Sequence, residues 1–334
     1  MKTWKMLLSA VVMFTIFAGT TLAADYNWTF QSSGAAGDDV YRFQQEWSQW
    51  VLEDSKGRIQ ISVLPADAVV KYTETLDAVG ANIIQGDLTD PSYFAGKDPA
   101  FSLIGNMVGA WSHPFQLFDM IKNGGGYEIF DGLLAKYNVK LLGVASTGVE
   151  AFVSKKPIRG VADLKGIKLR APQGMVNNVF TAVGATPVNL PGSEVYTALD
   201  KGVIDAADYT VFATNQAQGM NDIARFPIYP GFHSMPTMQV SMNLDTWNSL
   251  PADLKDVMIK NVDRFSQYMV EQHEKLDILA VAEAKAKGIE VVSWPKEEIA
   301  KFRNIAVTQW PKWSKSPTAK IWADAVAAYW KSKE

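Results

Sequence analysis

Residues 166 to 209 read GIKLRAPQGMVNNVFTAVGATPVNLPGSEVYTALDKGVIDAADY, and this stretch decides the fold. Its apolar pattern predicts a strand, a helix, a strand, a helix and a strand in succession, which is typical of a parallel sheet covered by helices. In the first strand, alternation places Leu169 and Ala171 on one face and Lys168 and Arg170 on the other. Arg170 therefore stands where a strand turns into a helix, the edge at which open α/β sheets bind ligands.

Arg170 is the residue of this stretch best suited to hold an anion. Its planar guanidinium group can donate two parallel hydrogen bonds to one carboxylate group. A single arginine is also often a surface residue or the partner of a structural carboxylate. The residue pattern by itself leaves these alternatives open.

The first 24 residues have the pattern of a signal peptide. Lys2 and Lys5 precede an apolar run over residues 6–18, and small residues near Ala23 or Ala24 offer a cleavage site. The run is shorter than a membrane-spanning helix requires. We therefore expect the mature chain to be exported and to work in the periplasm.

The composition excludes several classes of protein. The chain contains no cysteine, which excludes a disulfide framework, a thiolate metal site and a cysteine nucleophile. Without Lys2 and Lys5 the formal net charge falls from −3 to −5, and no basic cluster remains that could bind nucleic acid. A mature chain of about 310 residues is long enough to form two lobes.

The order of the predicted elements divides the chain into two lobes. Residues 25–148 alternate strands with helices and predict the first lobe, to which residues 237–294 return, while residues 149–236 predict the second lobe. Two crossings of the chain between lobes form a hinge. A long amphipathic helix over residues 251–288 is expected to span the lobes, and residues 295–334 form a helical tail.

The opening stretch also resembles the solute-binding receptors of TRAP transporters (tripartite ATP-independent periplasmic transporters). Three patterns recur in that family at this spacing: G-x-K-[IL]-R, G-A-x-P and E-x-Y-x-A-L-x-x-G-x-[IV]-D. The matching residues here are Gly166, Lys168, Leu169, Arg170, Gly184, Ala185, Pro187, Glu194, Tyr196, Ala198, Leu199, Gly202, Ile204 and Asp205. The resemblance implies a two-lobed α/β fold of the periplasmic-binding-protein type and assigns Arg170 to the carboxylate group of the ligand.

Two further segments resemble the branch of this family that binds 2-oxo acids. They are Tyr93-Phe94-Ala95-Gly96-Lys97-Asp98-Pro99 and Tyr229-Pro230-Gly231-Phe232-His233. A sequence common in the family, residues 243–251, precedes the long helix. The resemblance therefore covers nearly the whole mature chain.

The resemblance places aromatic residues around the cleft, where their rings could receive an aromatic or branched side chain of the ligand. These residues are Tyr93, Phe94, Trp111, Tyr209 and Phe232. Gln31 and His233 are also expected to contact the ligand.

Two acidic residues, Asp208 and Glu150, could determine which charged group or metal ion lies beside the ligand carboxylate. Asp208 precedes Tyr209 where the 2-oxo acid branch has glutamate followed by tryptophan, so it could help to hold a ligand-bridging Na⁺ or Ca²⁺ ion. A helix-capping role would explain Asp208 equally well. Glu150 could repel a second carboxylate or pair with an ammonium group, and a plain surface charge would explain it equally well. The metal ligands themselves stay unspecified.

Patterns of catalysis are missing from the sequence. It has no Gly-x-Ser-x-Gly elbow, no His-Glu-x-x-His and no phosphate-binding Gly-Lys-Ser/Thr loop. This absence and the family resemblance together predict a receptor, not an enzyme. The resemblance implies that it closes over a small organic monocarboxylate with a 2-oxo, 2-hydroxy or 2-amino group, aromatic acids included. The expected partner is a TRAP membrane permease. A homodimer is left open, and an ABC-type or sensor-associated receptor or an exported enzyme is the alternative function.

Overall fold

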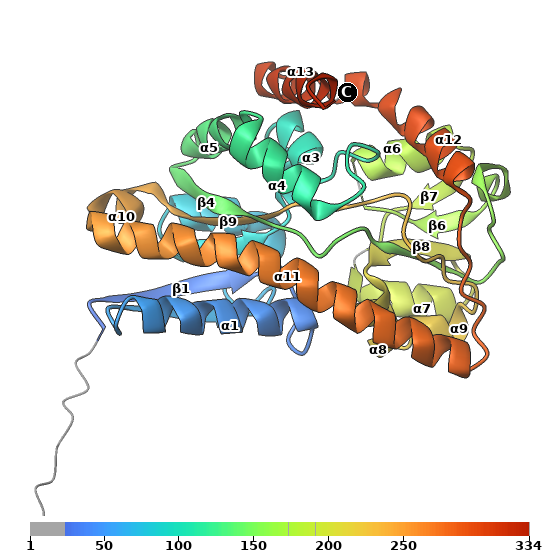
Figure 1. The fold of residues 1–334 in the computed structure, drawn as a ribbon, viewed down its shortest axis with the longest axis horizontal. Helices are drawn as coiled ribbons and strands as arrows, with labels where there is room; N and C mark the ends of the chain where they lie inside the picture. The colour runs from blue at the N-terminus through green and yellow to red at the C-terminus, as the bar shows by residue number, and fades with distance from the viewer. Residues whose placement is uncertain (1–23, 173, 191, 334) are drawn as a thin grey trace, which may run out of the picture.

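The computed structural model describes residues 24–172, 174–190 and 192–333. Almost all of the predicted signal peptide, residues 1–24, lies outside the described residues. Two β-sheets, each covered by helices, form two lobes, which confirms the expected α/β architecture (Figure 1). No helix in the described part of the chain combines the length and the apolar character needed to cross a membrane.

The first lobe is built on a five-stranded sheet with the strand order β2-β1-β3-β9-β4. Its strands are β1 (Tyr26–Ser32), β2 (Ile59–Leu64), β3 (Gly86–Thr89), β4 (Val139–Ala145) and β9 (Met238–Asn243). Strand β9 runs antiparallel to β3 and β4, between which it lies. The chain therefore leaves this lobe after β4 and returns to the middle of its sheet.

Helices cover this sheet and the region beyond it. They are α1 (Asp39–Asp54), α2 (Thr75–Gly80), α3 (Pro99–Gly105), α4 (Pro114–Asn123), α5 (Gly126–Ala135) and α10 (Leu244–Ser249). Helix α1 packs beside β2, whereas α5 packs beside β4 at the opposite edge of the sheet. Alternate residues of β2 are buried, as expected for a strand with one face on the core.

The second lobe is built on a four-stranded sheet with the strand order β5-β8-β6-β7. Its elements are β5 (Ala151–Ser154), β6 (Lys168–Arg170), α6 (Met175–Ala182), β7 (Thr186–Val188), α7 (Val195–Asp200), β8 (Ala206–Thr210), α8 (Phe212–Ala217) and α9 (Met220–Ile223). The predicted alternation of strands and helices over residues 166–209 is confirmed, and so is the burial of Leu169 and Ala171. Strand β6 pairs in parallel with both β7 and β8.

The connection between these strands creates a crevice. The chain passes from β6 to β7 on one side and then returns to β8 on the other side of β6. In open α/β sheets, such a reversal of strand order leaves a crevice beyond the carboxyl ends of the strands. Arg170 is the last residue of β6, so it stands at this crevice.

Two helical segments join the lobes. Helix α11 (Ala252–Ala286) packs on α1 and β4 in the first lobe and on α8 in the second (Figure 1). Pro251 precedes it, and Gly288 with φ +71° follows its last turn, as expected at helix ends. In the tail, α12 (Lys296–Val307) packs on α6, and α13 (Pro317–Lys331) packs on α3 and α5. The predicted lobe boundaries stay a prediction, and the two sheets fall on either side of them.

Candidate functional site

A cavity of about 490 Å³ lies between the two lobes. Loops that follow β1, β2 and β3 line it from the first lobe, and the ends of β6 and β8 together with α8 line it from the second. Thr147 and Pro236, on the two chain crossings, close it on the hinge side. The cavity therefore lies at the crevice that the strand order of the second sheet predicts.

Arg170 lines this cavity and is held in place by backbone carbonyl groups. Its Nη1 donates a hydrogen bond of 2.6 Å to the carbonyl oxygen of Asp208, and its Nε donates one of 3.2 Å to that of Leu190. The guanidinium carbon lies 5.8 Å from the ring centre of Tyr209. Among the described residues none accepts a hydrogen bond from Nη2, so this donor is available to a bound anion.

An irregularity between β5 and β8 brings acidic side chains beside this arginine. Ala151 pairs with Thr210, but Phe152 pairs with Asp208, so Tyr209 is the extra residue of a β-bulge. Bulges of this kind redirect side chains beside binding sites. Because β5 runs antiparallel to β8, Glu150, directly before β5, lies next to Asp208 near the end of β8.

Glu150, Asp208 and His233 form a buried cluster, the acid–histidine cluster, in which one ligand atom from each residue lies within 4.8 Å of the others. His233 Nε2 lies 2.6 Å from Asp208 Oδ1, and both side chains are buried. Burial, and next the charge of Asp208, raises the pKa of Glu150 well above its usual value. Burial also opposes ionisation of Asp208, but His233, a hydrogen bond from Glu150 and the charge of Arg170 together lower the pKa of Asp208. The two pKa shifts have opposite directions, so a proton in this cluster favours Glu150 over Asp208.

Asp90 brings a further carboxyl group into the cavity from the first lobe. It follows β3, and its Oδ1 accepts a hydrogen bond of 2.7 Å from the backbone N–H of Ser92, which caps the 3₁₀ helix Pro91–Phe94. Burial raises the pKa of Asp90 to about 7, although hydrogen bonds from Ser92 oppose the shift.

This shift predicts a pH dependence of stability. In the unfolded chain an aspartate loses its proton at about pH 4. Between about pH 4 and about pH 7 folded Asp90 keeps that proton, so the free energy of unfolding should fall as the pH rises through this window. Asp90→Asn should remove part of that slope in urea titrations. Asp98→Asn is the control, because Asp98 caps α3 from an equivalent Asp-Pro turn outside the cavity. Equal slopes in wild type and Asp90→Asn would contradict the expectation.

A hydrogen bond joins the two lobes at the cavity. Gln218, after α8, donates from Nε2 to Asp38 Oδ1 at 3.2 Å, and both residues line the cavity. Asp38 precedes α1 in the first lobe, where its Oδ2 accepts from the backbone N–H of Ala35. The contact therefore stabilises an arrangement in which the lobes lie close together.

The expected aromatic wall needs correction. Tyr93 and Tyr209 line the cavity, as does Tyr72, but Phe94, Trp111 and Phe232 do not. Phe94 packs edge-on against Phe101, and Trp111 packs against Tyr329 and Trp330 of the tail. Phe232 stacks on Trp294 at 3.8 Å between ring centres. These three rings are buried in the core, and residues distant in the sequence cover Trp111 and Phe232.

Gln31 and His233 also lie outside the cavity lining. Gln31 is fully buried, and its Oε1 accepts hydrogen bonds from the backbone N–H groups of Val69 and Val70, while its Nε2 donates to the Val70 carbonyl. It holds the loop that carries Tyr72 to the cavity. His233 does not line the cavity and instead contacts the buried carboxyl group of Asp208.

Sequence reasoning did not find several cavity residues. They are Asp38, Asp67, Tyr72, Asp90, Thr214 and Gln218. The signal for Asp90 was present, since an Asp-Pro pair directly after a buried strand marks a capped turn at the ligand edge of a sheet. No local pattern marks Gln218 as a residue that faces Asp38.

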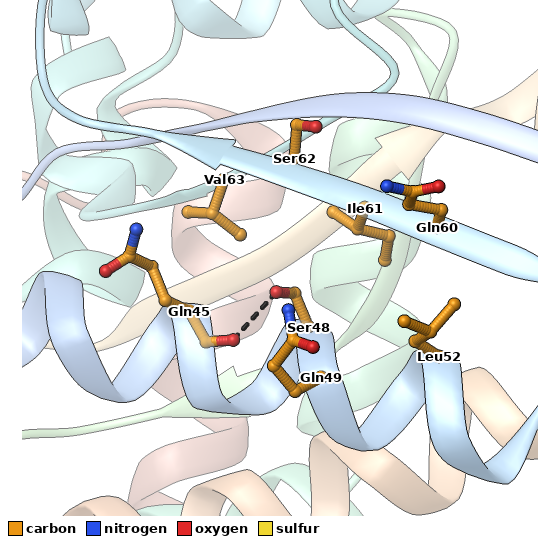
Figure 2. A pocket seen from close by; sticks show the side chains of 8 residues that line it. All are labelled: Gln45, Ser48, Gln49, Leu52, Gln60, Ile61, Ser62 and Val63. Atoms are coloured by element: carbon orange, nitrogen blue, oxygen red, sulfur yellow. Dashed lines mark hydrogen bonds between the residues drawn. The ribbon is translucent and has the colours of Figure 1, made fainter. Parts of the chain in front are cut away.

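A second hollow, of about 370 Å³, lies on the outside of the first lobe. Figure 2 shows its lining side chains between α1 and β2, where Ser48 Oγ donates a hydrogen bond of 2.7 Å to the Gln45 carbonyl. The lining residues are Gln45, Ser48, Gln49, Leu52, Gln60, Ile61, Ser62 and Val63. None of these side chains is charged, so this hollow has no cation for a carboxylate ligand.

Comparisons with known proteins show the family and the fold of this chain. The family model of the bacterial extracellular solute-binding proteins, family 7, matches residues 30–316. The monocarboxylate 2-oxoacid-binding periplasmic protein of Nostoc is 33% identical over 74% of this chain and 68% of its own length. A TRAP periplasmic solute-binding protein of Rhodobacter sphaeroides, solved in an open state without ligand, is 48% identical, with a TM-score of 0.80 over 92% of this chain and 98% of that chain.

Two more distant structures share the fold. A TRAP solute-binding protein of Bordetella bronchiseptica with calcium and picolinate is 23% identical, with a TM-score of 0.83 over 93% of both chains. One of Pseudoalteromonas atlantica with sodium and pyruvate is 22% identical, with a TM-score of 0.79 over 92% of this chain and 94% of that chain.

Proposed function

Because this chain belongs to the bacterial extracellular solute-binding proteins of family 7, the receptors of TRAP transporters, we propose that its interlobe cavity captures a small organic monocarboxylate for a membrane permease. The observation that carries the proposal is Arg170. It is the one cationic side chain among the described residues that line the cavity, and two carbonyl groups hold it with Nη2 left over.

The ligand is proposed to carry a 2-oxo, 2-hydroxy or 2-amino group beside its carboxylate. The carboxylate takes the free side of Arg170, which lies at the carboxyl end of β6. A second carboxylate would find no further cation among the described lining residues, and burying it unpaired would be costly. The Nostoc relative, named as a monocarboxylate 2-oxoacid-binding protein, supports this class.

Closure of the lobes is the proposed working movement. A ligand that touches Arg170 in the second lobe and Tyr93 or Asp90 in the first stabilises the closed arrangement. The hydrogen bond between Gln218 and Asp38 adds to the same state. Binding, orientation and exclusion of water are the tasks of these residues, and the ligand leaves chemically unchanged.

The acid–histidine cluster fits a calcium or sodium ion that bridges the ligand. Glu150 and Asp208 supply the carboxylate oxygens that these ions prefer. One ligand atom from each of Glu150, Asp208 and His233 lies within 4.8 Å of the others, so the three could share one cation. When bound, the ion would supply positive charge beside the ligand carboxylate. The relatives with calcium and picolinate and with sodium and pyruvate support this assignment.

The remaining assignments follow from the family. The receptor is proposed to work in the periplasm, after removal of residues 1–23 or 1–24, and to deliver its ligand to the TRAP permease. A homodimer is retained as a proposal, since the Bordetella relative is described as a dimer. No role in nucleic-acid binding is proposed, because the chain has a net negative charge.

Calorimetry with pyruvate, lactate and 2-oxobutanoate, in calcium and in chelator, tests the proposal. We expect binding in calcium, and a loss of about 10- to 100-fold in chelator, because charge-assisted contacts are worth roughly 1.5–3 kcal/mol. Glu150→Gln should reduce the difference between the two buffers. Equal affinity in both buffers would remove the ion and leave the arginine site standing, whereas exclusive binding of dicarboxylates would contradict the ligand class.

A further inference from the structure

The cavity carries more acidic than basic groups. Asp38, Asp67, Asp90 and Glu150 line it, and Arg170 carries the one guanidinium group among the described lining residues. A bound monocarboxylate pairs with Arg170 and adds another negative charge. Each acidic group with an oxygen atom that accepts no hydrogen bond from the protein then needs another partner. That partner is water, a cation or a hydrogen-bond donor of the ligand.

Three of these four acids are already partnered or solvated. Both oxygens of Asp38 accept hydrogen bonds, from Ala35 and Gln218. Asp67 is exposed to solvent, and its Oδ1 accepts from the backbone N–H of Tyr72. Glu150 belongs to the acid–histidine cluster.

Asp90 is different. Its Oδ1 accepts from Ser92, but no described residue donates to Oδ2, and the side chain is half-buried in the wall of the cavity. The charges of Asp90 and of the cluster act on one another, since Asp90 contributes to the raised pKa of Glu150 and Asp208 to that of Asp90. Asp90 therefore brings to the cavity wall a carboxyl oxygen for which no hydrogen bond from a described residue is found.

A second observation points to a ligand with polar groups. Thr214 in the opposite wall is 6% exposed, and its Oγ1 has no hydrogen-bond partner among the described residues. Thr147, at the hinge side of the cavity, also has a buried and unpartnered Oγ1. Buried polar atoms without partners are costly, so a ligand that satisfies them gains affinity.

We propose that Asp90 accepts a hydrogen bond from a hydroxyl or ammonium group of the ligand that lies away from the carboxylate held by Arg170. This inference rests on the proposed function, since it takes the Arg170 carboxylate site as given. It narrows the ligand class to monocarboxylates with a second, donor-bearing group. A terminal carboxylate is disfavoured there because it offers no donor and faces the Asp90 oxygen.

Four acids with the same carbon chain test the proposal by calorimetry on the full mature protein at about pH 8.5, where Asp90, with its pKa of about 7, has lost its proton. They are 2-hydroxybutanoate, 2,4-dihydroxybutanoate, 4-amino-2-hydroxybutanoate and malate, which end in a methyl, a hydroxyl, an ammonium and a carboxylate group. We expect the two donor-bearing acids to bind about tenfold tighter than 2-hydroxybutanoate, and malate to bind weakest.

The variant Asp90→Asn separates Asp90 from the rest of the cavity. Asparagine keeps an oxygen for the Ser92 N–H but removes the charge, so the preference for the ammonium acid should shrink about tenfold and malate should gain. Asp98→Asn, the equivalent Asp-Pro turn outside the cavity, should keep the wild-type order.

The outcomes distinguish this inference from the proposed function. Equal binding of the methyl, hydroxyl and ammonium acids, or the same order in Asp90→Asn as in wild type, overturns the role of Asp90 and leaves the monocarboxylate site intact. Tightest binding of malate overturns the inference as well. If wild type binds none of the four acids, the proposed function itself fails, because all four carry the 2-hydroxy carboxylate group that the Arg170 site is proposed to hold.

Discussion

Replacement of Arg170 by alanine should weaken binding of the carboxylate ligand by about 100-fold or more. The substitution removes the one guanidinium group among the described lining residues and leaves a buried carboxylate without a partner, at a cost of roughly 3–5 kcal/mol. The loss should appear in calorimetry as weaker binding. The far-ultraviolet circular dichroism spectrum of the variant should match that of the wild type, which shows that the fold is kept.

Arg170→Lys refines this expectation. Lysine keeps the charge but cannot donate at once to the Asp208 carbonyl, the Leu190 carbonyl and the ligand in the planar geometry of arginine. We expect an intermediate loss of roughly 1.5–3 kcal/mol. Lys168→Ala, an exposed cation on the same strand outside the cavity, should leave affinity unchanged. Wild-type affinity in Arg170→Ala would exclude Arg170 from the site.

Phe232→Ala should lower the free energy of unfolding by roughly 3–5 kcal/mol and leave the order of ligand preference unchanged. Phe232 is 2% exposed, stacks on Trp294 and meets Phe302 of α12 edge-on at 4.9 Å. Its removal opens a cavity in the core where the tail packs on the second lobe. Urea denaturation of wild type and variant measures the loss.

Phe115→Ala is the matched control, because Phe115 is 48% exposed and its removal should change stability by about 0.5 kcal/mol or less. A stable Phe232→Ala variant that no longer binds ligand would contradict the core assignment. That result would return Phe232 to the aromatic wall that the family resemblance implies.

The sequence predicts the structure correctly where a local pattern is compatible with only one conformation. Alternation in β6 places Arg170 opposite the buried Leu169, and Pro251 and Gly288 bound the long helix α11. Ligands of open α/β sheets bind at the carboxyl ends of the strands, so the position of Arg170 at the end of β6 predicts that it lines the cavity. This prediction needs no knowledge of distant contacts.

The aromatic residues show where such prediction ends. A phenylalanine suits a core and a cavity wall equally well, and what covers it decides between them. For Phe232 the covering residues are Trp294 and Phe302, and for Trp111 they lie in the tail. None of these partners is near in the sequence, so no local pattern reports them.

Gln31 and Gln218 are polar examples of the same limit. Gln31 faces a loop about 39 residues further along the chain, and Gln218 meets Asp38 from the other lobe. A glutamine amide can bind a ligand, a loop of its own lobe or a residue of the other lobe. Which of these it binds depends on which partner lies beside it after folding. The acid–histidine cluster depends likewise on the β-bulge at Tyr209, which sequence alternation does not reveal.

The most direct measurement of the central claim is mass spectrometry of the small molecule released from the receptor. The mature protein would be exported by cells grown on mixed organic acids, purified without refolding and denatured to release what the cavity holds. We predict one unchanged organic monocarboxylate, present in wild type and lost in Arg170→Ala. Release of dicarboxylates alone, or of a compound without a carboxylate group, would contradict the account.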